Sequence, residues 1–244
     1  MNINIKQFSI EFKKGTVILA GAGPGSINLI TLKLKNVLKQ ADVIIYDALV
    51  NKEILKFSKK SVKLIYAGKI KEKRACTQSE INNWLLQYSK LNKKVLRLKG
   101  GDISFFSRVS QEVNFLKKNK IKTRVFSGIT SSQASIQNSN SLFFNKTRIC
   151  NLITGHRNIK GRGKPIDYNL ISQNGGKIII YMGVGQINEI VLNLLNNGIK
   201  KNEKVTLVYN ATLMSQRLFY TNLGECGDLV RNKRIKSPVI IIIR

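Results

Sequence analysis

Short apolar runs that alternate with longer segments of helical period are the feature that most constrains how this chain folds. Runs such as Val17-Ile18-Leu19-Ala20 and Ile178-Ile179-Ile180-Tyr181 have the length of buried strands. The longer segments between the runs place their apolar residues on one side of a helix. This alternation is typical of α/β proteins with a mainly parallel sheet, and we predict an α/β fold.

The first strand-helix-strand unit is the clearest of these. It consists of a strand at 16–20, a glycine-rich loop at 21–25, a helix from about 29 to 40 and a strand at 42–47. The further strands that we predict cover residues 62–66, 94–98, 122–126, 149–154, 177–181, 204–209 and 238–243, with helices at about 78–91, 108–119 and 187–196.

The run Ser127-Gly128-Ile129-Thr130-Ser131-Ser132 interrupts this alternation with small residues, which suit a linker or a tight turn into a new unit. We therefore predict an N-terminal tail at 1–14, an α/β domain with the glycine-rich loop at 15–126 and a second α/β domain at 127–244. A small-molecule site is expected in the cleft between the two domains, where ligands commonly bind.

The charge of the chain is strongly positive, because 42 Lys and Arg stand against 13 Asp and Glu, which gives a net charge of +29. A field of this sign attracts nucleic acid, phospholipid surfaces or a small molecule with many carboxylates. A general bias toward Lys, Ile and Asn at solvated positions explains the same charge equally well. The charge alone therefore selects no partner.

Several kinds of site and location are disfavoured by simple features. No apolar run approaches the roughly 20 residues that a membrane span requires, and residues 1–14 do not read as a secretory signal, so we expect a cytoplasmic protein. Cys76, Cys150 and Cys226 are far apart in the sequence, and the chain has a single histidine. We expect reduced cysteines and no metal site.

The loop Gly21-Ala22-Gly23-Pro24-Gly25 lies between a predicted strand and a predicted helix. Glycines there let the backbone approach a ligand, and the helix N-terminus offers free N–H groups. The spacing is neither the dinucleotide-binding fingerprint nor a P-loop. Read without context, the loop is either a ligand site or only a tight connection.

Motifs along nearly the whole chain from about residue 15 resemble those of one family. In chain order they are Gly21-Ala22-Gly23-Pro24-Gly25, Leu29-Ile30-Thr31-Leu32-Lys33, Ala41-Asp42-Val43, Tyr46-Asp47-Ala48-Leu49-Val50, Ala67-Gly68-Lys69, Gln78-Ser79-Glu80-Ile81-Asn82, Val95-Leu96-Arg97-Leu98-Lys99-Gly100-Gly101-Asp102, Gly128-Ile129-Thr130, Thr154-Gly155-His156, Tyr181-Met182-Gly183 and Lys236-Ser237-Pro238. Together they resemble the uroporphyrinogen-III C-methyltransferases, which belong to the tetrapyrrole methylases.

The resemblance implies a methyltransferase with two α/β domains, usually a homodimer, that holds S-adenosyl-L-methionine between the domains and releases S-adenosyl-L-homocysteine. It implies methylation of uroporphyrinogen III at C2 and C7, which gives precorrin-2 by way of precorrin-1, a step toward cobalamin or siroheme. The donor contacts that it implies are Pro24, Gly100, Gly101, Asp102, Phe105, Thr130, Ser131, Met182 and Ala211.

Two of these positions make physical sense as donor contacts. Asp102 follows two glycines after a strand, where a carboxylate accepts hydrogen bonds from a ribose or an amine. Met182 follows an apolar strand and suits an adenine or a sulfur atom. Without the surrounding motifs, a plain turn and a core methionine explain the two residues as well.

The resemblance assigns proton transfer to Asp47, which ends one predicted strand, and to Lys69, which follows another. The alternative roles are a cap on a helix at 52–57 for Asp47 and surface charge for Lys69. His156 is read as a structural or exposed imidazole rather than a base.

A tetrapyrrole with many carboxylates needs basic partners. The candidates for binding it are Arg97, Lys99, Arg108 and Arg148.

The chain departs from the family pattern in the region expected to bind the tetrapyrrole. Ile103 replaces the usual proline after Asp102, and Phe106-Ser107-Arg108-Val109-Ser110-Gln111-Glu112 replaces a segment with more glycine. The segment Leu142-Phe143-Phe144-Asn145-Lys146 replaces one that contains histidine. We therefore expect the residues of the donor site to match the family pattern more closely than those of the tetrapyrrole site do.

Three other functions remain open on the sequence. One is a sister methyltransferase that acts on a later precorrin, and another is an RNA methyltransferase of related fold. The third is a basic nucleic-acid-binding protein without enzymatic activity, although the basic residues do not form a stripe with interleaved aromatics.

Overall fold

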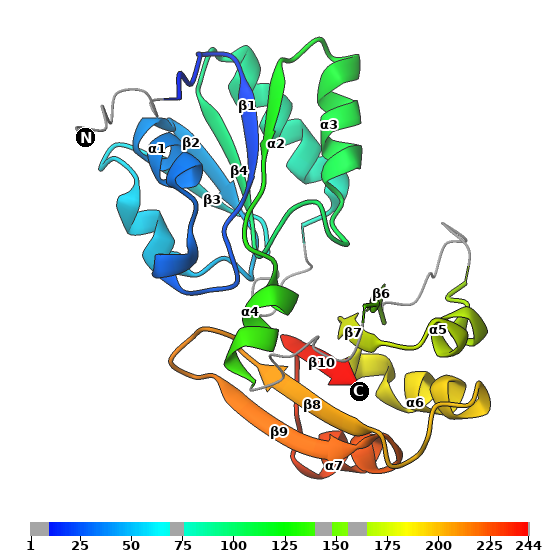
Figure 1. Cartoon of the computed structure of the whole chain (residues 1–244). Coiled ribbons are helices and arrows are strands. Elements are labelled where there is room, and N and C mark those ends of the chain that lie inside the picture. Colours follow the sequence, from blue (N-terminus) through cyan, green and yellow to red (C-terminus); the bar gives the residue numbers. More distant parts are fainter. Residues whose placement is uncertain (1–9, 69–75, 140–147, 156–164, 244) are drawn as a thin grey trace, which may run out of the picture. The chain divides into compact units, whose positions relative to one another are not determined.

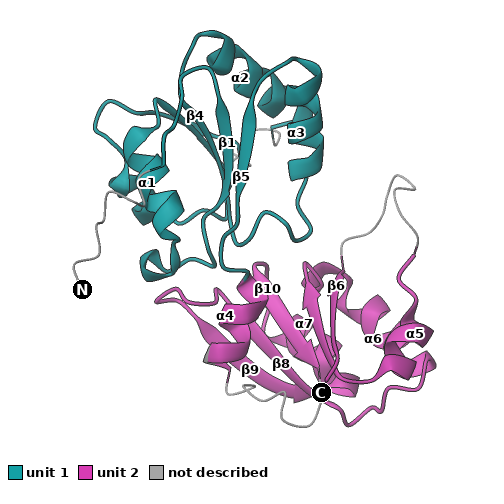
Figure 2. Cartoon of the chain, turned by 45° about the horizontal axis from the view of Figure 1, so that its top comes forward, with its two compact units in different colours: residues 1–130 teal, residues 131–244 magenta. Residues whose placement is uncertain are grey.

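A computed structural model describes residues 10–68, 76–139, 148–155 and 165–243 of the chain. The chain divides into two compact units, Met1–Thr130 and Ser131–Arg244, which Figure 2 colours separately. Each unit contains one five-stranded sheet and several helices. The prediction of an α/β fold is therefore confirmed, and each unit is described by itself below.

The first unit is built on a fully parallel sheet. Its strands are β1 (Val17–Gly21), β2 (Val43–Tyr46), β3 (Lys63–Tyr66), β4 (Val95–Lys99) and β5 (Thr123–Phe126). They lie in the order β3-β2-β4-β1-β5, and each neighbouring pair is parallel. Parallel strands need crossover connections, which the helices between them provide.

Helices cover both faces of this sheet (Figure 1). On one face, α1 (Leu32–Gln40) buries Leu34, Val37 and Leu38 against β1, β2 and β4. On the other face, α2 (Gln78–Lys90) and α3 (Val109–Lys118) pack on alternate residues of the same strands. Because side chains of a strand alternate between faces, β1 and β2 are apolar on both sides, as the continuous runs of the sequence predict.

The helix predicted at 29–40 begins later than the apolar pattern indicates. Ile27–Leu29 forms a short 3-10 turn, and α1 starts only at Leu32. The hydroxyl of Thr31 accepts a hydrogen bond from the Leu34 N–H, so Thr31 caps the helix. A favourable N-cap residue therefore decides the boundary, rather than the apolar spacing.

The second unit has a mixed sheet. Its strands are β6 (Cys150–Thr154), β7 (Lys177–Tyr181), β8 (Lys204–Tyr209), β9 (Arg217–Asn222) and β10 (Val239–Ile243), in the order β6-β7-β10-β8-β9. Only β6 and β7 are parallel, and the other neighbours are antiparallel. The expectation of a mainly parallel sheet is thus wrong for this unit, because apolar runs do not reveal strand direction.

Helices again lie on both faces of the second sheet. On one face, α5 (Tyr168–Asn174), α6 (Ile187–Asn196) and α7 (Cys226–Asn232) bury apolar residues against the strands. On the other face, α4 (Ser131–Asn138) contacts β10, and Ile136 packs on a small cluster around Ile240. Among the described residues, no helix combines the length and apolar character that crossing a bilayer requires.

Four elements of the second unit lack a clear signal in the sequence. The helices α4, α5 and α7 are short and rich in polar residues, and β9 has no fully buried residue. Their packing against the sheet therefore determines them more than their own composition does.

The buried thiol of Cys226 gives a test of this core. Burial raises the pKa of the Cys226 thiol to about 11, and the side chain has no exposed surface. Desolvation also raises the pKa of the Cys150 thiol, against the charge of Lys177, but Cys150 is exposed. We expect a maleimide to label Cys150 in the native protein and to label Cys226 only after denaturation, as peptide mass mapping measures. Equal labelling of both in the native protein would contradict the described core.

Candidate active site at the carboxyl ends of the parallel strands

The order of strands in the first unit reverses between β4 and β1. The chain leaves β1 through α1 toward β2, and it leaves β4 through α3 toward β5 on the opposite side. Open α/β sheets bind ligands outside the carboxyl ends of their strands at such a reversal. The topology therefore directs attention to the loops that follow β1 and β4.

These two loops are joined through their backbones. The Gly23 N–H donates to the Gly101 carbonyl at 3.1 Å, and the Gly101 N–H donates to the Gly23 carbonyl at 2.7 Å. Gly23 has a φ of 77° and Gly101 a φ of 68°, a backbone conformation that favours glycine. The predicted motifs at 21–25 and 100–102 thus form one paired structure.

Asp102 ties a third loop to this pair. Its Oδ2 accepts the Gly128 N–H at 2.9 Å, and its Oδ1 accepts the Ser104 N–H at 2.6 Å. A carboxylate offers about four acceptor positions, so Asp102 keeps acceptor capacity on both oxygens for a bound hydroxyl or amine. The loops after β1, β4 and β5 therefore meet around one half-buried carboxylate.

Steric crowding also explains why glycine occupies positions 21 and 128. A Cβ at Gly21 would lie 2.5 Å from the Gly101 carbonyl oxygen, and a Cβ at Gly128 would lie 2.5 Å from the same oxygen. Both distances are too short for any side chain. Close packing of three turns thus explains Gly21 and Gly128 without a ligand, whereas the acceptors of Asp102 remain available for one.

Asp47 lies beside this region at the end of β2. Its N–H donates to the Leu98 carbonyl on β4, and its carboxylate contacts Arg97 and Lys99 of that strand. Asn51, rather than Asp47, caps the 3-10 helix Lys52–Phe57. The alternative in which Asp47 serves as a helix cap is therefore wrong, and its carboxylate is held by cations instead.

The basic residues expected to bind substrate differ in exposure. Arg97 and Lys99 are buried, with 1% and 8% of their surface exposed, and both are engaged in ion pairs. This burial is at odds with direct contact between Arg97 and a substrate carboxylate. Arg108, which precedes α3, and Arg148, which precedes β6, are exposed.

Exposed apolar side chains lie after the same strands. Phe105 is 41% exposed and Phe106 is 40% exposed, and their rings lie 6.5 Å apart. Leu49 lies against Gly100, where an added Cβ would approach the Leu49 Cβ to 2.8 Å. An apolar surface therefore accompanies the polar groups of Asp47 and Asp102 at this end of the unit.

The expected donor residues of the second unit follow strands of its sheet. Met182 comes directly after β7, with a φ of 54° and 46% of its surface exposed. Ala211 follows β8 and is buried in the cluster with Val208 and Ile240. Thr130 ends the first unit, and Ser131 begins α4.

Three residues singled out from the sequence need separate mention. Pro24 is half-buried within the paired loops. Lys69 and His156 lie outside the described residues, as does the segment at 142–146. The proton-transfer role of Lys69 therefore stays a prediction.

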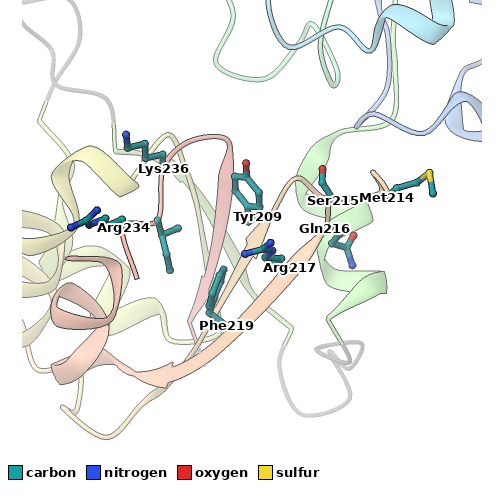
Figure 3. Close-up of a pocket in the computed structure, with 9 residues that line it drawn as sticks. Tyr209, Met214, Ser215, Gln216, Arg217, Phe219, Arg234 and Lys236 are labelled. Atoms are coloured by element: carbon teal, nitrogen blue, oxygen red, sulfur yellow. The ribbon is translucent and has the colours of Figure 1, made fainter. Parts of the chain in front are cut away.

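A hollow of about 490 Å³ in the second unit involves none of the expected site residues that the structure describes. Tyr209, Arg217 and Phe219 of β8 and β9 line it, together with Arg234 and Lys236 from the segment after α7 (Figure 3). The cationic ends are spread around the hollow rather than gathered at one point (Figure 3). We therefore place the candidate site at the paired loops and not here.

Comparison with known families decides the class of the protein. Residues 16–227 match the family described as Tetrapyrrole (Corrin/Porphyrin) Methylases. The chain belongs to the tetrapyrrole methylase family. The resemblance read from the sequence motifs is thereby confirmed.

Similar members of the family have named activities. The chain is 35% identical to a uroporphyrinogen-III C-methyltransferase of Methanocaldococcus jannaschii, over 94% of this chain and 95% of that one. It is 34% identical to the protein of the same name from Priestia megaterium, over 94% and 97%. A siroheme synthase of Hydrogenovibrio crunogenus is 32% identical over 98% of this chain but only 50% of its own length.

Solved structures of family members agree with the fold. A uroporphyrin III C-methyl transferase of Thermus thermophilus superposes with a TM-score of 0.78 at 28% identity, covering 93% of this chain and 91% of that one. The same protein complexed with S-adenyl homocysteine gives a TM-score of 0.77 over the same shares. A cobalt precorrin-4 methyltransferase, 21% identical, gives a TM-score of 0.82 over 94% of each chain, which shows the fold alone.

The packing of the three loops yields a prediction about stability. Gly21→Ala places a methyl group against the Gly101 carbonyl, so we expect a loss of about 1–3 kcal/mol in the free energy of unfolding, measured by urea denaturation. Gly185→Ala is the matched control, because a Cβ there meets nothing within 4 Å. Equal effects of the two substitutions would refute the close packing of the loops.

Proposed function

We propose that this chain transfers methyl groups from S-adenosyl-L-methionine to C2 and C7 of uroporphyrinogen III, giving precorrin-2 by way of precorrin-1. The observation that carries the proposal is the paired loops with Asp102 at the strand reversal of the first unit. Nearly full-length similarity to two uroporphyrinogen-III C-methyltransferases supports this substrate over a later precorrin.

The residues present fit a nucleoside-bearing methyl donor. Gly100 carries no side chain and is half-buried, so a ligand can approach the backbone there, next to Gly101 in the paired loops. Asp102 keeps acceptor positions for ribose hydroxyls. Met182 and Phe105 each expose apolar surface that suits an adenine ring. We propose Pro24, Thr130, Ser131 and Ala211 as further donor contacts, as the family resemblance implies.

The proposed reaction requires no covalent bond between the protein and the substrate. When bound, the donor supplies a methyl group that is already electrophilic at its sulfonium. The protein must hold a pyrrole carbon in line with that methyl group and accept the proton that the macrocycle loses afterwards. We assign the proton to Asp47, whose side chain is 28% exposed at the end of β2, and propose that Lys69 assists it.

Binding of the substrate carboxylates is assigned to the exposed arginines. Arg108 and Arg148 are free to present a planar guanidinium to a carboxylate, whereas Arg97 is enclosed within the first unit. Lys99 keeps a small exposed fraction, and we place it behind Asp47 rather than in direct contact with substrate. The overall positive charge then favours approach of a polyanionic macrocycle.

The number of methyl groups transferred tests this function directly. We expect purified protein with uroporphyrinogen III and labelled donor to give a product with two added methyl groups, counted by mass spectrometry. The control omits the protein. A product with no added methyl, from protein that still binds the donor, would contradict the proposed substrate and favour a later precorrin.

Substitutions of Asp102 and of Asp47 are expected to impair different steps, donor binding and turnover respectively. Asp102→Ala removes acceptors for the donor, so we expect donor affinity to fall on the order of 10- to 100-fold by calorimetry. Asp47→Asn keeps the shape of the side chain but not its basicity, so we expect turnover to fall while donor affinity is kept. The assignments are wrong if Asp102→Ala binds the donor as the unaltered protein does, or if Asp47→Asn turns over normally.

A further inference from the structure

Glu112 is a carboxylate with no exposed surface, although a buried charge is costly unless it is paired. It lies in the first turn of α3, where the helix dipole favours an anion. Its Oε1 accepts hydrogen bonds from Arg97 Nε at 3.3 Å, Lys99 Nζ at 3.3 Å and Gln78 Nε2 at 3.2 Å. One oxygen of Glu112 therefore holds two cations.

These two cations lie on one face of β4. Arg97 and Lys99 are two positions apart in the strand, so both point toward the side that α3 covers. Neighbouring Val95 points to the same side and joins the apolar core there. Charged residues have thus replaced apolar ones in the last part of an otherwise buried strand face.

The same cations reach Asp47 on the adjacent strand β2. Arg97 Nη2 lies 2.5 Å from Asp47 Oδ1, and Lys99 Nζ lies 3.4 Å from Asp47 Oδ2. Each oxygen of the Asp47 carboxylate therefore has its own cation. Such an arrangement fixes both the position and the rotation of the carboxylate, because turning it would break both contacts.

The charges of the four residues balance only when Glu112 is present. Two cations face two carboxylates, and Asp47 is the most exposed of the four. Glu112 Oε2 has no hydrogen-bond partner among the described residues, so its Oε1 makes all three contacts. Glu112 therefore matters mainly as a charge that keeps Arg97 and Lys99 in place beneath Asp47.

We propose that Glu112 is a positioning residue, which acts through Arg97 and Lys99 to orient the carboxylate of Asp47 for proton transfer. This inference rests on the proposed function of Asp47 and adds Glu112, Arg97 and Lys99 to the machinery behind it. None of the three needs to touch the substrate.

The first experiment compares two substitutions of Glu112. Glu112→Gln keeps the shape and removes the charge, whereas Glu112→Asp keeps the charge and shortens the side chain. We expect Glu112→Gln to lower kcat on the order of 10- to 100-fold with donor affinity and KM nearly unchanged, and Glu112→Asp to recover part of the loss. Glu53→Gln, an exposed glutamate paired with Lys56, is the matched control and should leave kcat unaltered.

The relative activities of the two Glu112 variants distinguish a positioning role from a packing role. If the side chain only filled space, the isosteric Glu112→Gln would be the more active of the two, and that result would overturn the proposal.

A second variant tests the proposal in case Glu112→Gln alone does not fold. Lys99→Met combined with Glu112→Gln removes one cation and one anion, so the buried site stays neutral. We expect this double variant to unfold cooperatively and to bind the donor, but to keep a reduced kcat because Asp47 Oδ2 has lost its partner. A folded double variant with the kcat of the unaltered protein would overturn the proposal.

A readout without turnover separates this inference from the proposed function. The carboxyl carbon-13 resonance of Asp47, assigned by its absence in Asp47→Asn, reports the surroundings of that carboxylate directly. We expect it to move in Glu112→Gln and to stay in place in Glu53→Gln. An unmoved resonance in Glu112→Gln refutes the positioning role, whereas a moved resonance in a protein that methylates no uroporphyrinogen refutes only the proposed reaction.

Discussion

The structure of the candidate site depends on direct packing of backbone against backbone at the carboxyl ends of β1, β4 and β5. The Gly101 carbonyl lies where a side chain at either Gly21 or Gly128 would have to be, and Asp102 fastens the third loop through the Gly128 N–H. Three loops from distant parts of the sequence are thereby brought to one point. A ligand bound there would meet mainly backbone and one carboxylate, which suits a site that recognises polar groups at close range.

Strand β4 connects this packing to the chemistry proposed for the site. The loop that follows β4 supplies Gly101 and Asp102. Arg97 and Lys99, on the side of β4 that faces α3, hold the carboxylate of Asp47 at the end of the neighbouring strand β2. The donor contact and the proton acceptor that we propose therefore lie on one rigid framework. Rigid elements hold catalytic groups more precisely than loops do, because the rest of the sheet fixes the strand.

The high net positive charge of the chain does not come from this buried network. Arg97 and Lys99 are enclosed and neutralised by two carboxylates, so this group adds nothing to the net charge of the chain. The whole net charge of +29 therefore resides elsewhere along the chain, where salt screens it. Exposed arginines such as Arg108 and Arg148 are better placed to meet the polyanionic substrate that we propose.

The sequence by itself determined the α/β class, most strands and the family, because apolar runs and glycine motifs are local signals. It also singled out Asp47 and Asp102, which the structure describes at adjacent strand ends of one sheet. The tertiary structure alone decided that Arg97 is an internal ion-pair partner and that Glu112 holds it, since both depend on the fit of α3 against β4. It likewise decided the antiparallel pairings of the second sheet, because an apolar run such as 239–243 carries no sign of its direction or its neighbours.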